Sequence, residues 1–319
     1  MKTPTLPVLL LLGASALCVT PLAAQVEIKR GSDQITVEIN GAPFTSLYIA
    51  NVRKPYLHPL RSASGKIVSR QYPMESVEGE PKDHPHHRGL WFTHGDVNGV
   101  DFWMSDPMAR NDNGAIIAVK QIHRAKGGRD KGQIVATFEW RDKAGAVHLV
   151  EERTMTFYAE KDRRIVDIDA KLIAANRDVK FGDTKEGSFG LRLNPQLQEQ
   201  KGTGTMTNAE GAQKEKQVWG KASPWVDYAG TLDGEKMGIA ILDHPTNPRH
   251  PTYWHSRAYG LFAANIFGLH DFYADKTKDG SLTLKKGDSL RFRYRVLIHP
   301  GDTASANVAA EFKKFAQIK

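Results

Sequence analysis

Apolar and polar residues alternate along many short segments of this chain, which is the pattern of β-strands with one buried face. The alternation is clearest at residues 34–39, where Ile35, Val37 and Ile39 would face a core. The Asn40-Gly41 pair follows directly and predicts a tight hairpin turn. Further strands are predicted at residues 134–140, 147–150, 154–158, 165–173, 237–242, 282–284 and 290–298.

Helical periodicity is rare and is strongest near the C-terminus. Residues 303–316 carry an apolar stripe of Val308, Phe312 and Phe315, with Asp302 or Thr303 as the expected N-cap. Many strands and a single clear helix predict an all-β fold, a large antiparallel β-sandwich with a C-terminal helix.

The polar, glycine-containing segment at residues 201–216 separates two predicted strand regions. Its composition predicts a long surface loop, and loops of that length often border functional sites. Nothing else along the chain resembles a linker, so residues 25–319 are expected to form one domain.

The first 24 residues have the pattern of a secretory signal peptide: a basic start at Lys2, an apolar run from Val8, and the small residues Ala23 and Ala24 before Gln25. We expect cleavage after Ala24 and a periplasmic or secreted protein. The apolar run is too short for a membrane anchor, and no later segment approaches a membrane span, so no membrane insertion is expected.

The single cysteine, Cys18, lies within this signal, so the exported chain would contain no disulfide and would depend on core burial for its stability. The formal charge of +8 falls to +7 when Lys2 is removed, because residues 1–24 contain no acid. The positive charge is spread along the chain and interleaved with acids, whereas nucleic-acid binders concentrate it on one face. A nucleic-acid partner is therefore not expected.

Residues 83–103 hold the densest collection of chemically active side chains. Four of the twelve histidines fall within eleven residues there, close to two tryptophans. Imidazoles ligate metals and titrate near neutral pH, and tryptophan faces cover sugar rings. The candidate site residues of this stretch are His84, His86, His87, Arg88, Trp91 and His94. If the backbone is extended, His84 and His86 share one face of a strand and His87 points away.

Two later segments add acids, bases and cations. Residues 182–187 place Asp183, Lys185 and Glu186 between glycines, next to a strand-like run. Residues 243–262 follow a predicted strand and contain three prolines, which favour a stiff, extended loop. The candidate site residues of this second segment are Asp243, His244, His255, Arg257 and Tyr259. We predict that residues 83–94, 183–186 and 243–257 converge on one pocket.

Several motifs make the chain resemble a family of exported bacterial proteins of uncharacterised function that is labelled methane oxygenase PmoA-like. The motifs are Asp83-His84-Pro85-His86-His87-Arg88-Gly89-Leu90-Trp91, Gly182-Asp183-Thr184-Lys185-Glu186-Gly187, Trp225-Val226-Asp227-Tyr228, Asp243-His244-Pro245, Tyr259-Gly260-Leu261-Phe262 and His299-Pro300-Gly301. One departure is Ile266, which stands where the family pattern has proline.

This resemblance implies bacterial export and polysaccharide utilisation. The monooxygenase subunit behind the label is a bundle of membrane helices, which a chain with this strand pattern does not match, so the activity is not carried over. The long series of strands is also similar to the galactose-mutarotase-like supersandwich proteins.

The chain lacks a Gly-x-Ser-x-Gly elbow, a phosphate loop and a dinucleotide fingerprint, which argues against serine hydrolase and nucleotide chemistry. The leading interpretation is a carbohydrate-active hydrolase, lyase or epimerase that acts on a small-molecule or oligosaccharide substrate. Its expected acid/base residues are His84, His86, His87, His94, Glu186, Asp243 and His255. Its expected substrate-binding residues are Arg88, Trp91, Asp183, Lys185, His244, Arg257 and Tyr259.

Two alternatives stay open. One is a non-catalytic carbohydrate-binding protein, if the tryptophans form an exposed platform. The other is a copper- or zinc-dependent oxidase, since closely spaced histidines can bind a divalent metal. The sequence does not identify a cofactor.

Overall fold

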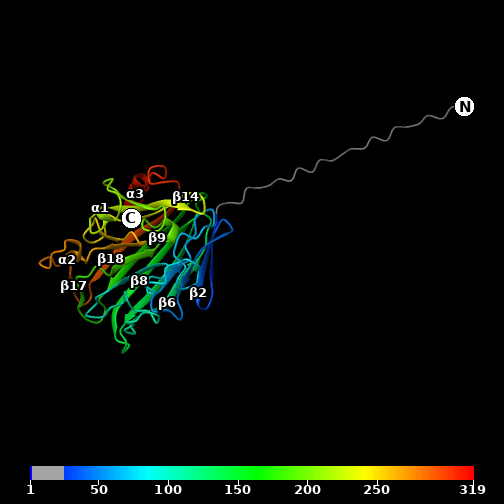
Figure 1. The fold of residues 1–319 in the computed structure, drawn as a ribbon. Helices are drawn as coiled ribbons and strands as arrows, with labels where there is room; N and C mark the ends of the chain where they lie inside the picture. The colour runs from blue at the N-terminus through cyan, green and yellow to red at the C-terminus, as the bar shows by residue number, and fades with distance from the viewer. Residues whose placement is uncertain (2–24) are drawn as a thin grey trace.

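Two antiparallel β-sheets face each other in the computed structural model, which describes residue 1 and residues 25–319 (Figure 1). Residues 2–24, which make up nearly all of the predicted signal peptide, lie outside the described residues. The fold class predicted from the sequence, an all-β sandwich with a C-terminal helix, is confirmed.

The first sheet has eight strands in the order β1-β2-β3-β4-β5-β11-β16-β15. Its strands are β1 Val26–Arg30, β2 Gln34–Ile39, β3 Ala42–Tyr48, β4 Tyr56–His58, β5 Leu90–His94, β11 Gly187–Arg192, β15 Tyr253–Ser256 and β16 Leu261–Asn265. The predicted hairpin turn joins β2 to β3, and Asn40 and Gly41 both have the positive φ angles, 54° and 76°, that a type I′ turn requires.

The second sheet also has eight strands, in the order β12-β13-β14-β18-β9-β8-β7-β6. Its strands are β6 Ile116–Lys126, β7 Lys131–Arg141, β8 Val147–Tyr158, β9 Arg164–Ile173, β12 Thr205–Asn208, β13 Trp225–Leu232, β14 Glu235–Asp243 and β18 Ser289–Pro300. A separate pair is formed by β10 Val179–Phe181 and β17 Leu282–Leu284. The short helices are η1 Pro195–Leu197, α1 Glu215–Val218 and α2 Leu269–Phe272.

One long strand, β8, replaces the two strands predicted at residues 147–150 and 154–158. Three charged residues lie between them: Glu152 faces solvent, and Glu151 and Arg153 are buried as an ion pair, so the strand continues without interruption. Glu151 is fully buried and accepts hydrogen bonds from Trp140 Nε1 at 2.8 Å and Arg153 Nε at 2.6 Å. Its charge is therefore compensated without contact with solvent.

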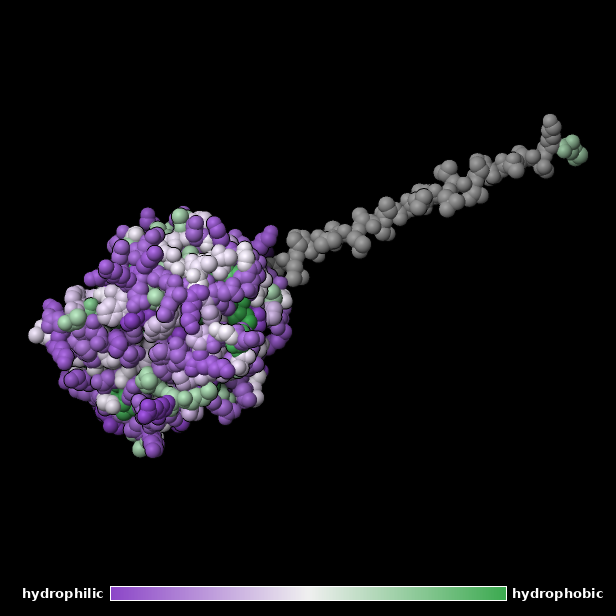
Figure 2. All heavy atoms as spheres, viewed as in Figure 1, coloured by the Kyte–Doolittle hydropathy of each residue, from purple (hydrophilic) through white to green (hydrophobic). Residues whose placement is uncertain are grey.

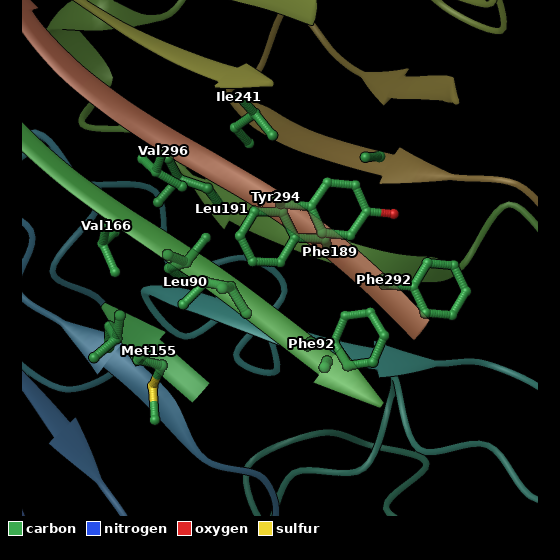
Figure 3. Packing of buried hydrophobic residues seen from close by; sticks show 14 of the residues in the cluster. Leu90, Phe92, Met155, Val166, Phe189, Leu191, Ile241, Phe292, Tyr294 and Val296 are labelled. Carbon is green, nitrogen blue, oxygen red and sulfur yellow. The ribbon is translucent and has the colours of Figure 1, made fainter. Parts of the chain in front are cut away.

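Aromatic and aliphatic side chains from both sheets fill the space between them (Figure 3). Phe189 of β11 stacks on Tyr294 of β18 with ring centroids 4.7 Å apart and planes 3° from parallel. Phe92 of β5 lies 5.5 Å from Phe292 of β18. These contacts join the centres of the two sheets, so burial of apolar surface fixes how the layers face each other.

The C-terminal helix α3, Val308–Ala316, begins five residues later than predicted and lies against β14 (Figure 1). The two predicted N-cap residues form other hydrogen bonds and do not cap α3. Asp302 Oδ1 accepts a hydrogen bond from Ser305 N at 2.9 Å, and Thr303 Oγ1 donates to the buried carboxylate of Asp227 at 2.6 Å. The predicted apolar stripe is confirmed, since Val308 and Phe315 are buried and Phe312 packs beside them.

The loop predicted at residues 201–216 contains a strand. Within it, β12 pairs with β13 at the edge of the second sheet, and Met206 is fully buried. The polar composition misled the prediction because β12 has only four residues and contributes one apolar side chain to the core.

The side of the molecule seen in Figure 2 is mainly hydrophilic, with apolar residues in small, separate spots. No helix within residues 25–319 combines the length and hydrophobicity needed to cross a membrane.

Candidate functional site

A second, smaller apolar cluster lies on the face of the first sheet that is turned away from the sandwich core. Along β5, Leu90 and Phe92 belong to the core, whereas Trp91 between them belongs to this second cluster. Trp91 pairs with Tyr56 of β4 on one side and with Gly190 of β11 on the other, so these residues lie on the same face. We call this surface, with the loops that cover it, the outer face. Most of the predicted site residues gather there.

Two fully buried arginines hold the histidine segment against the outer face. Arg70 Nη1 donates to Asp83 Oδ1 at 2.6 Å, and its Nη2 donates to the backbone oxygens of His84 at 2.8 Å and His87 at 3.2 Å. Arg192 Nη2 donates to the two carboxylate oxygens of Asp83 at 2.9 and 3.2 Å. Burial would raise the pKa of Asp83, but the hydrogen bond from His84 and the charges of Arg192 and Arg70 hold it well below its usual range.

The expectation that His84 and His86 share one face of an extended segment is wrong. His84 has a φ of 44°, and the backbone N–H of His87 donates to the His84 oxygen at 3.0 Å, so the segment is a turn. Arg70 stabilises this turn because its Nη2 donates to the backbone oxygens of both His84 and His87. As a result all three imidazoles meet, with centroid separations of 5.7 Å for His84–His86, 4.8 Å for His84–His87 and 4.3 Å for His86–His87.

Four of the rings form a continuous stack from the surface to the sheet. Tyr259 lies 5.5 Å from His84, His84 lies 4.8 Å from His87, and His87 lies 5.2 Å from Trp91, with interplanar angles of 8°, 9° and 17°. The His84 side chain is 42% exposed, whereas Trp91 is buried. The stack is therefore open to solvent at His84, next to its Tyr259 end.

His86 and His87 are held in the neutral form. Burial, followed by the charge of Lys54, lowers the pKa of His86 to about 2, and burial lowers the pKa of His87 well below its usual value. Arg192 Nη1 lies 3.2 Å from His87 Nδ1. Because a guanidinium only donates, this Nδ1 accepts and the proton lies on Nε2. His87 Nε2 and His86 Nδ1 are buried, and neither has a hydrogen-bond partner within residues 25–319.

Carboxylates and a lysine complete this group. Burial raises the pKa of Asp101, and the charge of Glu186 acts in the same direction. Lys54 is almost fully buried, and its Nζ donates to the backbone oxygens of Trp103 at 2.7 Å and Ser105 at 3.0 Å. Burial lowers the pKa of Lys54 to about 7.

The loop before β11 brings Lys185 and Glu186 to the edge of the outer face. Lys185 Nζ lies 3.2 Å from Glu186 Oε1, and these side chains are 36% and 30% exposed. His255 Nδ1 is hydrogen-bonded to the Lys185 backbone oxygen at 2.9 Å, and burial lowers the pKa of His255 to about 3. His255 is thus a buried, neutral residue that positions the loop.

Among the predicted substrate-binding residues, Arg88 and Trp91 already have protein partners. Arg88 forms a two-pronged ion pair with the buried carboxylate of Asp106, at 2.5 and 3.0 Å. Trp91 is covered by His87 and by Trp103, whose ring centroid lies 5.2 Å away. Trp91 presents no free surface, and the Arg88 side chain is only 16% exposed with its charge paired.

Arg257 and Tyr259 lie at the accessible end of the stack. The Arg257 guanidinium is 5.7 Å from the Trp219 ring centroid and 5.8 Å from that of Tyr259, and its Nε lies 2.8 Å from Glu215 Oε1. The Arg192 guanidinium also lies over the Tyr259 ring, at 4.6 Å. Arg257 is 33% exposed and remains available for a hydrogen bond to a ligand.

The structure does not bring His94 or Asp183 to the histidine cluster. His94 Nε2 is 2.9 Å from the Gly182 oxygen, its ring packs on Phe267 at 4.5 Å, and burial lowers its pKa to about 4. Asp183 pairs with His270 Nδ1 at 2.5 Å and accepts from Gly280 N at 2.5 Å. Both residues stabilise the end of the sandwich near α2.

Asp243 and His244 also have separate partners, in and behind the second sheet. Asp243 is fully buried and accepts hydrogen bonds from Asn247 Nδ2 at 2.6 Å and Thr252 N at 2.9 Å, with His250 Nδ1 at 2.7 Å. His244 is hydrogen-bonded to the Ile318 oxygen at 3.0 Å and packs on Phe315 of α3. β14 belongs to the second sheet, whereas the turn at residues 83–87 precedes β5 of the first sheet, so Asp243 and His244 do not join the histidine cluster.

The three clustered imidazoles contact one another through ring faces and edges, an arrangement that does not direct their nitrogens to one point. Within residues 25–319, no group of three or more His, Cys, Asp or Glu side chains is arranged to hold a metal ion.

The sequence did not single out Lys54, Asp101, Arg70 or Arg192 as site residues. A signal existed for Arg192, because a charged residue stands at an outward position of a strand whose other residues are apolar or small. Lys54 and Arg70 carry no such local signal. Their importance comes from burial against a loop that is distant in sequence.

Removing the Asp83 side chain should destabilise the protein, because it leaves two buried guanidinium groups without their counter-charge. For Asp83→Ala we expect a loss of about 2–4 kcal/mol in the free energy of unfolding, reduced by solvent screening because Asp83 is 43% exposed. Urea denaturation at pH 7 measures this. Asp162→Ala, which breaks an exposed pair with Arg163, is the matched control and should change stability by less than about 1 kcal/mol. Equal effects of the two variants would contradict the assignment.

Residues 34–313 match the sequence profile described as "Family of unknown function (DUF6807)". The chain belongs to this family. The DUF6807 match covers most of the chain and gives no support to the methane oxygenase label. No curated protein matches the sequence.

Several solved structures resemble this DUF6807 protein at low identity. An alpha-galactosidase from Lactobacillus brevis has 9% identity and a TM-score of 0.43, covering 88% of this chain and 40% of its own, so the chain spans two-fifths of that enzyme. A galactose mutarotase-like protein from Lactobacillus casei has 9% identity and a TM-score of 0.43, covering 86% of this chain and 100% of its own. A putative aldose 1-epimerase from Escherichia coli has 11% identity and a TM-score of 0.33, covering 86% and 99%. At these values the likenesses assign no activity to the DUF6807 chain.

Proposed function

We propose that the outer face of the first sheet is the active site of an exported, carbohydrate-active enzyme that uses acid–base chemistry, as a hydrolase, lyase or epimerase. The observation that carries this proposal is the neutral His86 imidazole, whose buried Nδ1 has no partner within residues 25–319. The charge of Lys54 acts both on His86 and on Asp101, a carboxyl of raised pKa on which Glu186 also acts. Titratable groups with shifted pKa values that gather on one face are a common mark of catalysis.

The environments of these groups suggest different roles. A neutral imidazole is a hydrogen-bond donor or acceptor that can polarise a hydroxyl or carbonyl oxygen, which is the role we assign to His86. Glu186, which is 30% exposed, is assigned as the group that takes a proton from the substrate. Asp101, whose pKa is raised by burial, is assigned as the group that returns a proton.

The accessible rim suits a hydroxylated molecule. His84, Lys185 and Arg257 are 42%, 36% and 33% exposed, and each offers hydrogen-bond donors or acceptors. His84 and Arg257 also lie against the Tyr259 ring. Sugars combine hydroxyl groups with an apolar ring face, so they need both kinds of contact. A small-molecule or oligosaccharide substrate therefore fits this rim better than an extended apolar ligand.

A non-catalytic carbohydrate-binding protein is the second candidate. The exposed end of the ring stack, at His84 and Tyr259, favours it because an aromatic surface can hold a sugar without any proton transfer. Binding without turnover would distinguish this candidate from the enzyme.

The test is a screen of the full chain against mono- and oligosaccharides and glycosides, with product formation followed by chromatography. We expect turnover of at least one substrate, and a loss of about 100-fold or more in His86→Gln. His123→Gln is the matched control, because His123 lies exposed on β6 and bonds only Thr137 at 2.7 Å. Turnover that survives His86→Gln unchanged would contradict the assignment.

A further inference from the structure

A polar pocket lies directly beside the outer face. It has a volume of about 640 Å³, within the range of about 300–1,000 Å³ that ligand sites in proteins occupy. Its walls come from the segment after η1, from the start of α1 and from the loop between β15 and β16. Arg257 and Tyr259 line this pocket and also border the outer face, so the pocket adjoins the outer face at these two residues.

These two residues place the pocket near the proposed chemistry. The Tyr259 ring is 5.5 Å from His84, and the His84 ring is 5.7 Å from His86. His84, which is 42% exposed, stacks on Tyr259, and Tyr259 lines the pocket, so a molecule of two linked units can contact His84 with one unit and the pocket with the other.

The charges that line the pocket are already neutralised within the protein. Glu215 Oε1 pairs with Arg257 Nε at 2.8 Å, and Glu215 Oε2 accepts from Ala258 N. Glu199 accepts hydrogen bonds from Met206 N at 2.9 Å and Glu215 N at 3.0 Å. The lining therefore contains two carboxylates and two cations, Arg257 and the exposed Lys214. Its net charge is zero and does not favour a charged ligand.

The rest of the lining consists of amide, hydroxyl and bare backbone groups. Gln200 and Thr205 contribute side chains with donors and acceptors. Gly204 contributes only backbone, and no side chain would fit there, because a Cβ would lie 1.9 Å from the Leu197 oxygen. Such a wall can form many hydrogen bonds to a neutral molecule that carries several hydroxyl groups.

We propose that this pocket is a second subsite, which binds an uncharged sugar unit linked to the one at the outer face. The substrate is then a neutral oligosaccharide of at least two units. This inference rests on the proposed function, since it assigns the first unit to the outer face.

Isothermal titration calorimetry of the full chain can test it. The probes are glucose and galactose, their neutral di- and trisaccharides, and galacturonic acid with its di- and trimer. We expect a neutral disaccharide to bind at least about 10-fold more tightly than its monosaccharide. Gln200→Trp, which fills the pocket from an exposed position on its rim, should remove this gain. Gln121→Trp, the same change on the exposed side of β6 at the opposite edge of the second sheet, should keep it.

The outcomes separate the two proposals. Monosaccharides that bind or react with no gain from a second unit, or a gain that survives Gln200→Trp, would overturn the second subsite alone. A larger gain with the galacturonic acid oligomers would overturn its neutral character. If no sugar of any length binds, the proposed function fails and the subsite with it.

Discussion

Lowering the pH from 7 to 5 is expected to cost the protein most of its stability. Five almost fully buried histidines are held neutral: burial lowers the pKa to about 4 in His58 and His94, to about 3 in His255, to about 2 in His86, and well below the usual value in His87. In the unfolded chain the same groups would take up protons near pH 6.5.

The direction follows from these differences. A group whose folded pKa is depressed contributes stability that is complete above its unfolded pKa and is lost as the pH falls toward the folded value. Each imidazole contributes a slope of about 1.4 kcal/mol per pH unit below pH 6.5, and a domain of this kind has only about 5–15 kcal/mol to lose. His299 acts in the opposite sense, because its bond to the buried Asp227 raises its pKa despite burial, but it is one group against these five and His244, whose pKa is also lowered by burial.

Urea denaturation at half-unit steps from pH 7.5 to 5 measures this dependence. His255→Gln should remove one group from the slope, so that its difference from the parent shrinks by about 1.4 kcal/mol per unit below pH 6.5. His123→Gln, on the exposed face of β6, should leave the slope unchanged. A stability that stays constant from pH 7 to 5 would show that these imidazoles are not buried in the neutral form.

Replacing the Glu186 carboxylate is expected to have the largest effect on catalysis. In Glu186→Gln the side chain keeps its size but loses the group that we assign to proton transfer, so kcat should fall by about 100- to 10,000-fold. Stability should change little, because the lost pair with Lys185 is about one third exposed on both sides.

The assay is turnover of whichever sugar the screen identifies, with the thermal midpoint measured in parallel. Glu152→Gln is the matched control, since Glu152 pairs with Lys171 at 3.5 Å on an exposed part of β8. A fall in kcat/KM that comes entirely from KM, with kcat intact, would remove Glu186 from the proton transfer and leave it a binding role.

Local patterns in the sequence determined most of the strands. Period-two alternation set β2 at its observed bounds, and the Asn40-Gly41 pair set the turn that follows it. These features depend on residues within a few positions of each other, which is why they can be read without tertiary structure. The same reasoning failed at β8 and at the start of α3, where distant partners satisfy Glu151 and take up Thr303.

The sequence also indicated the segment to which we assign the chemistry, because four histidines beside tryptophans have no simple core or surface explanation. It did not determine the conformation of that segment. Arg70 and Arg192, from other parts of the chain, turn the backbone at residues 84–87 and bring the imidazoles together.

Tertiary structure alone decided which acids accompany those imidazoles. Asp243 looked equivalent to Glu186, yet the sheet order places Asp243 among Asn247, His250 and Thr252, whereas Asp101 and Lys54 join the outer face. Composition and spacing identify groups that can exchange protons. Their burial and neighbours, which set their pKa values and their access to a ligand, arise only when strands distant in sequence pair.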